Sequence, residues 1–159
     1  MIAAMKGLAK FLFILAAILP ASARADDEDV PYWASITVDK AYMRVGPSQR
    51  YKIDWVYVRK LLPIKVVRRE GPWRLIEDPD GTRGWMRDLL LSRERTALVT
   101  GSEPGEIHAR ASMGSPLLWR VEPGAVGKLG ECSSGWCEFE VAGHKGFMPE
   151  SRLWGPGEP

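Results

Sequence analysis

The chain has 159 residues, of which 45% are hydrophobic and 26% are charged, a balance that excludes general disorder. It is too short for a Rossmann oxidoreductase with a substrate domain, a TIM barrel or a protein kinase. Seven Trp, 16 Gly and 12 Pro indicate many turns and many aromatic side chains. This composition favours small β modules over a helical bundle.

The first 25 residues have the pattern of a secretory signal peptide. Lys6 and Lys10 supply a positive start, and Phe11–Leu19 is an apolar run of nine residues, the usual length for a signal. Small residues then allow cleavage after Ala25 or after Ala23. A transmembrane anchor needs about 20 apolar residues, and Lys10 interrupts this stretch. We therefore expect export to the periplasm or the exterior, with no membrane span after cleavage.

An acidic tail is expected at residues 26–34, and short strands separated by turns follow it. Gly46-Pro47-Ser48 has turn composition, and Asp78-Pro79-Asp80-Gly81 is a strong hairpin signal,. The extended segments expected between the turns are Ile36–Val38, Tyr42–Arg44, Ile53–Val58, Ile64–Arg69, Trp73–Glu77 and Arg83–Arg87.

The second half of the chain repeats the first half loosely. Trp73 recurs as Trp136, and Gly84-Trp85-Met86 recurs as Gly146-Phe147-Met148. Upstream, Arg44 matches Arg110, and either guanidinium could pair with a carboxylate or cap carbonyls. This repeat predicts two small β domains at residues 35–97 and 106–155, joined by a linker at 98–105 and followed by a tail at 156–159.

Cys132 and Cys137 are the two cysteines of the chain. Export makes a structural disulfide the expected state, and the spacing suits a hairpin whose turn is formed by residues 133–135. A redox pair usually reads C-x-x-C before a helix, and zinc would need two further ligands, for which His108 and His144 are the available histidines. We therefore predict no metal site.

The strand and turn motifs resemble those of a known family. Ala41–Ser48 (AYMRVGPS) resembles the N-x-R-x-G-P-S opening of bacterial SH3-like (SH3b) domains, although Tyr42 replaces the usual Asn. Gly71–Ile76 followed by Gly81–Met86 resembles the closing pattern G-x-W-x-x-V…G-x-x-G-W-V. Further similarity to an exported proteobacterial subgroup of tandem modules lies in Trp55–Arg59, Arg95–Val99, Trp136-Cys137 and Leu153–Gly155. Over residues 35–155, the resemblance implies an all-β fold of two tandem SH3-like barrels.

Trp55 and Tyr57 alternate with Val56 and Val58 along one predicted strand. If the valines face the core, Trp55 and Tyr57 point outward and form, with Tyr42, a stacking surface for a sugar or a peptide. Alternatively, this face packs on the second barrel.

The two halves differ in charge. Residues 35–97 hold 14 basic and 8 acidic residues, and residues 98–159 hold 5 and 8. The basic excess is either a solvated face that attracts the acidic regions or a site for an anionic partner. We take Arg59, Arg68 and Arg74 as its candidate ligand-binding cations. After cleavage, the whole chain would hold 19 basic and 20 acidic residues, which argues against nucleic-acid binding.

The sequence contains no pattern typical of an active site. A nucleophilic mechanism needs a Ser or Cys beside an oriented base, and no G-x-S-x-G, H-E-x-x-H or phosphate-binding glycine loop is present,. We therefore expect a non-catalytic protein without a cofactor. The leading hypothesis is recognition of cell-wall (peptidoglycan) peptide or glycan by the first barrel, and the alternative is a protein–protein adaptor or scaffold in the bacterial envelope.

Overall fold

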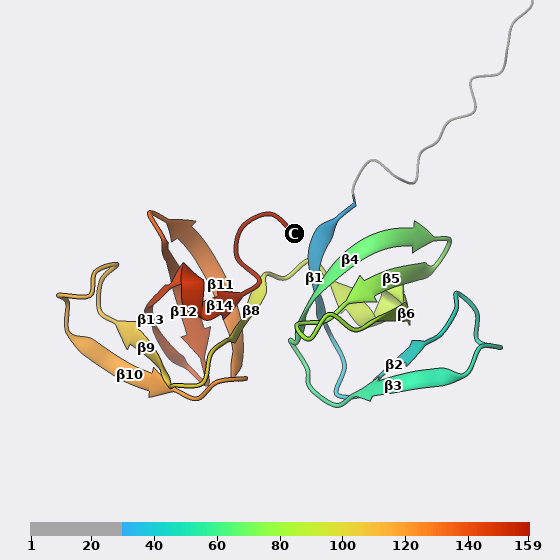
Figure 1. The fold of residues 1–159 in the computed structure, drawn as a ribbon, viewed down its shortest axis with the longest axis horizontal. Helices are drawn as coiled ribbons and strands as arrows, with labels where there is room; N and C mark the ends of the chain where they lie inside the picture. Colours follow the sequence, from blue (N-terminus) through green and yellow to red (C-terminus); the bar gives the residue numbers. More distant parts are fainter. Residues whose placement is uncertain (1–29) are drawn as a thin grey trace, which may run out of the picture.

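The computed structural model describes residues 30–159, and the predicted signal peptide and Asp26–Asp29 lie outside this range. The described part contains two seven-stranded sheets and no α-helix, and each sheet curls into a half-open barrel (Figure 1). The predicted all-β class with two SH3-like barrels in tandem is confirmed.

The first sheet has the strand order β3-β2-β6-β5-β4-β1-β7. Its elements are β1 (Tyr32–Ile36), β2 (Ala41–Arg44), β3 (Ile53–Tyr57), β4 (Pro63–Glu70), β5 (Trp73–Glu77), β6 (Arg83–Arg87), the 3-10 helix η1 (Asp88–Leu90) and β7 (Leu91–Ser92). We call residues 32–92 the first module.

The second sheet has the equivalent order β10-β9-β13-β12-β11-β8-β14. Its elements are β8 (Thr96–Val99), β9 (Gly105–His108), β10 (Leu117–Val121), β11 (Val126–Ser133), β12 (Trp136–Val141), β13 (His144–Pro149), the 3-10 helix η2 (Glu150–Arg152) and β14 (Leu153–Trp154). We call residues 96–154 the second module.

The module boundaries differ from the sequence expectation at both ends of the first sheet. Residues 32–34 were expected in the acidic tail, but they lie in β1, where Tyr32–Ser35 pair with β4. Residues 98–105 were expected to form the linker, but β8 (Thr96–Val99) is already part of the second sheet, because Thr96–Leu98 pair with β11. The connection between the sheets therefore lies at residues 93–95.

Each module has its own hydrophobic core, and a glycine lets two strands approach closely in each. The first core is centred on Ile36, Met43, Ile64, Ile76 and Met86, and the second on Val99, Ile107, Phe139 and Met148. A Cβ on Gly84 would lie 2.5 Å from Met43 Cγ, and a Cβ on Gly146 would lie 2.5 Å from Ile107 Cγ2. This shared packing requirement explains why the glycine recurs in both copies.

The position equivalent to Arg44 is His108, so the sequence match of Arg44 with Arg110 is wrong. Arg44 Nη1 donates to the carbonyls of Gln49 (3.2 Å) and Tyr51 (2.6 Å), which confirms a carbonyl-capping role for this guanidinium. His108 Nδ1 lies 3.2 Å from the Ser115 carbonyl, at the same place in the second module. The loop geometry is thus kept although the second copy lacks the R-x-G-P-S motif.

Cys132 and Cys137 form the predicted disulfide. They pair directly across β11 and β12, and the turn is the two residues Ser134 and Gly135, both with positive φ. Such a pair of positive φ values suits a tight hairpin, so the turn is shorter than expected. In the first module, the equivalent cross-strand pair is Arg69 and Arg74.

The C-terminal residues bind back to the first module, beside β1 (Figure 1). The Trp33 indole N–H donates to the Gly157 carbonyl at 3.0 Å, and the Trp33 and Trp154 rings meet edge to face with centroids 4.6 Å apart. Arg95 Nη2 donates to the Gly155 carbonyl at 2.7 Å. We call these contacts the terminal clasp, because they hold the two modules together at one end of their junction.

Candidate functional site

A cleft lies where β3 and the loop after it approach the second module. One part, a cavity of about 420 Å³, is lined by Trp55, Tyr57, Arg59, Leu62, Asp78, Pro79, Asp80, Thr82, Leu98 and Gly124. A second cavity of about 460 Å³ is lined by Arg59, Lys60 and residues 122–126. Both cavities include Arg59 and Gly124, so we treat them as one intermodule cleft.

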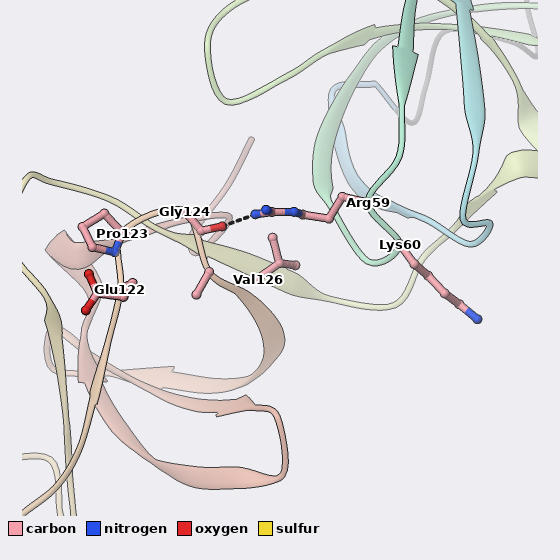
Figure 2. Close-up of a pocket in the computed structure, with 7 residues that line it drawn as sticks. Arg59, Lys60, Glu122, Pro123, Gly124 and Val126 are labelled. Atoms are coloured by element: carbon pink, nitrogen blue, oxygen red, sulfur yellow. Dashed lines mark hydrogen bonds between the residues drawn. The ribbon is translucent and has the colours of Figure 1, made fainter.

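Arg59 crosses the cleft from the first module to the second. Its guanidinium donates to the Gly124 carbonyl, whereas Lys60 extends away from the second module (Figure 2). Gly124 has a positive φ of 81°, a conformation that glycine adopts without steric cost. Lys60 makes no hydrogen bond or ion pair within residues 30–159, so its ammonium group is available to a ligand.

The aromatic wall of the cleft consists of one exposed and one buried ring. The Trp55 side chain is 57% exposed, and Tyr57 is 6% exposed. Val56 and Val58 are exposed, so the expectation that the valines face the core and Tyr57 points outward is wrong. The physical reason is the pairing of β3 with β2, which places Tyr57 opposite the fully buried Ala41.

Tyr57 is held by a buried carboxylate at the bottom of the cleft. Its hydroxyl donates to Asp78 Oδ2 at 2.9 Å, and burial, together with this hydrogen bond, raises the pKa of Tyr57 far above its usual range. Asp78 Oδ1 also accepts the backbone N–H groups of Asp80 (3.0 Å) and Thr82 (2.8 Å). Asp78 therefore shapes the turn that forms the rim, while the Asp80 carboxylate makes no ion pair within the described residues.

The other three candidate residues lie away from the cleft. Tyr42 pairs with Val56 and Met43 pairs with Trp55, so Tyr42 is on the opposite face of the β2–β3 hairpin from Trp55. The expected surface of Tyr42, Trp55 and Tyr57 is therefore not assembled. Arg68 forms an ion pair with Glu70 at 3.3 Å.

Arg74 has a structural role. Its Nη1 donates to the carbonyls of Gly71 (2.7 Å) and Trp73 (2.8 Å), and its side chain is largely buried. Only Trp55, Tyr57 and Arg59 of the six candidates lie together.

The equivalent cleft position in the second module is filled by a histidine. Trp119 pairs with Ile107 as Trp55 pairs with Met43, which makes the two tryptophans equivalent. The His144 ring lies against Trp119, with centroids 3.9 Å apart. In the first module, Thr82 occupies the position of His144. Thr82 directly precedes Arg83, which pairs with Glu77, and His144 directly precedes Lys145, which pairs with Glu140.

Sequence reasoning missed several residues that line the cleft. The D-P-D-G motif predicts only a turn at Asp78 and Asp80, and it does not indicate that Asp78 is buried against Tyr57. Gly124 and Leu98 come from the second module, and no local pattern indicates that they meet β3. Their place depends on how the two sheets pack.

Two half-open barrels of this strand order define a tandem pair of SH3-like modules. A family model described as "Bacterial SH3 domain" matches residues 37–93 and again residues 101–155. The chain therefore belongs to the bacterial SH3 domain family, whose members commonly bind cell-wall material. This family and the disulfide are typical of an extracellular or envelope protein. No helix within residues 30–159 is long and apolar enough to cross a membrane.

Comparison with solved structures gives weak similarities. The chain is similar to NlpC2 from Trichomonas vaginalis, with 10% identity, a TM-score of 0.36, and coverage of 78% of this chain and 48% of that one. It is similar to NlpC1 from the same organism with 12% identity, a TM-score of 0.36, and coverage of 88% and 50%. The chain thus spans about half the length of these structures. No curated protein matches it significantly.

Proposed function

We propose that the protein is a non-catalytic binding protein that recognises cell-wall peptide or glycan in the intermodule cleft. The observation that carries this proposal is the exposed Trp55 ring beside an open cavity that also offers charged groups of both signs. An indole face binds sugar rings and apolar peptide groups by stacking.

The charged groups of the cleft suit a ligand with ionic groups of its own. Arg59 brings a guanidinium group across the cleft, and Asp80 and Glu122 offer carboxylates without ion pairs within residues 30–159. Cell-wall peptides carry carboxylates and amino groups, so both kinds of cleft charge have a counterpart. The buried Tyr57–Asp78 pair supports the wall of the cleft rather than facing the ligand directly.

Co-sedimentation of the purified protein with protein-free peptidoglycan tests this proposal. We expect pelleting at low salt and weaker pelleting at moderate salt, because screening reduces the contribution of exposed charges. Trp55→Ala should weaken pelleting by about tenfold, the loss expected for an exposed aromatic anchor. No pelleting at either salt concentration would overturn the proposal in favour of an adaptor that binds an envelope protein.

Trp119→Ala is the matched control, since it removes the equivalent tryptophan from the second module. One face of its ring lies against His144, and Trp119, although 43% exposed, does not line the intermodule cleft. Pelleting should therefore stay within about twofold of the unchanged protein. Equal losses in both variants would show that the binding site is not in the cleft.

A further inference from the structure

The first sheet ends in a strand with an open edge. β3 is the last strand of its sheet and is bonded only to β2. The backbone groups on its other edge therefore have no strand partner, which makes β3 a template for pairing with another chain. Exposed apolar side chains lie on both faces of this edge: Trp55 on one, and Val56 with its neighbour Tyr42 on the other. Val58, directly after the strand, is 76% exposed.

The second module keeps the tryptophan as Trp119 but shows that the fold does not require apolar residues at the positions of Tyr42, Val56 and Val58. The cross-strand pair Tyr42–Val56 is replaced by Glu106–Arg120 in the second module. Val58, which directly follows β3, is replaced by Glu122, which directly follows β10. Glu106 and Arg120 form an ion pair at 3.5 Å. Charges at an edge strand oppose pairing with other chains. At these three positions the second module is therefore protected and the first is not, although β10 also exposes Leu117, Leu118 and Trp119 and β3 contains Asp54.

Positive charge flanks the open edge at both ends. Residues 39–60 contain six basic and two acidic side chains, whereas the equivalent residues 103–124 contain two basic and three acidic ones. Arg50 and Lys52 precede β3, and Arg59 and Lys60 follow it. A partner segment with carboxylates at both ends therefore complements this edge.

We propose that β3 accepts an extended segment of a partner protein as an added strand. The segment has apolar side chains in its middle and acidic residues at its ends. An added strand gains backbone hydrogen bonds along the open edge, and its alternating side chains meet Trp55 on one face and Val56 on the other. A glycan has no regular ladder of N–H and C=O groups to pair with this edge, so the partner is a polypeptide.

Selection from a phage-displayed library of random peptides on the purified full chain tests this inference. We expect enriched sequences that alternate apolar residues, carry Asp or Glu at the ends and lack Pro in the middle. A synthetic copy of one such peptide should protect the amides of β3 from hydrogen exchange. Absence of enrichment, or protection confined to other strands, would overturn the inference.

A triple variant, Tyr42→Glu, Val56→Arg and Val58→Glu, gives the first module the residues that the second module carries on the same fold. Peptide affinity should fall by about tenfold or more, because an edge charge opposes strand pairing. Val45→Glu, at an exposed site outside this edge, adds the same net charge and should change affinity by less than about twofold. Unchanged affinity in the triple variant would contradict a site on β3.

The same variants separate this inference from the proposed function. Tyr42, Val56 and Val58 do not line the intermodule cleft, so the triple variant should still pellet with peptidoglycan. Loss of peptide binding with retained pelleting supports two separate sites. Loss of both in a folded triple variant would show that β3 offers one shared site, which contradicts the inference.

Discussion

The two modules share one strand order but differ in what they place beside the equivalent tryptophans. In the first, the pair Tyr57–Asp78 is polar and hydrogen-bonded. In the second, the equivalent positions are the apolar Val121 and Val141, which pack against the core. Because the fold forms with either pair, the buried polar pair is not a requirement of the architecture. It accompanies the longer turn and the open cleft that distinguish the first module.

The largest expected difference in stability between the modules concerns the equivalent glycines Gly84 in β6 and Gly146 in β13. Gly146→Ala should cost about 3 kcal/mol and Gly84→Ala about 1 kcal/mol. A Cβ at Gly146 would lie 2.6 Å from the His108 carbonyl oxygen as well as touching Ile107, whereas at Gly84 it would meet the flexible Met43 side chain. Native-state hydrogen exchange measures the free energy of unfolding of each module separately. Equal losses of stability in the two variants would show that both cores accommodate the added methyl group equally well, which contradicts the prediction.

The disulfide provides the next largest difference between the modules. Reduction should destabilise the second module by about 2 kcal/mol, because the bond closes a short loop, and should leave the first module unchanged. The measurement is hydrogen exchange in β11–β12 and in β4–β5 with and without reductant. The Cys132→Ser, Cys137→Ser variant serves as a control, since reductant should have no effect on it.

The Tyr57 hydroxyl should contribute less. Tyr57→Phe removes one hydrogen bond to Asp78, which keeps its two backbone donors, so we expect a loss of about 1 kcal/mol in urea denaturation. Tyr51→Phe is the matched control, because Tyr51 is exposed and its hydroxyl makes no hydrogen bond within the described residues. A similar loss in both variants would remove the special role of the Tyr57–Asp78 pair.

The smallest expected effect is a loss of stability of the first module at acid pH. The hydrogen bond from Arg83, together with Lys65, lowers the pKa of Glu77 below its usual 4.5. A lowered folded pKa gives stability that is present above the unfolded value and lost as pH falls through the folded value. Stability should therefore decrease below about pH 4.5, and less steeply in Glu77→Gln. Identical pH profiles for the two proteins would contradict this assignment.

Local patterns predicted the fold well. The paired motifs around Gly84 and Gly146 identified two copies, because close packing at these points disfavours any side chain. The Cys132–Cys137 spacing identified a hairpin. The facing of β3 could not be predicted, since Trp55, Val56 and Tyr57 are all suited to either side of a strand. Its pairing with β2 decides which side is buried.

The candidate site was predicted only in part for a related reason. Trp55, Tyr57 and Arg59 are neighbours in sequence, and the structure brings them to one cleft. Tyr42 and Arg74 were linked to them by residue type alone. The contribution of Gly124 depends on the packing of two sheets that no short motif describes.

The terminal clasp makes the placement of the modules depend on residues outside both sheets. Trp33 in β1 donates to the carbonyl of Gly157, which follows β14, the last strand of the second sheet. Neither hydrophobic core contains a residue from 156–159. Removal of these four residues should therefore leave both barrels folded while it loosens the cleft between them.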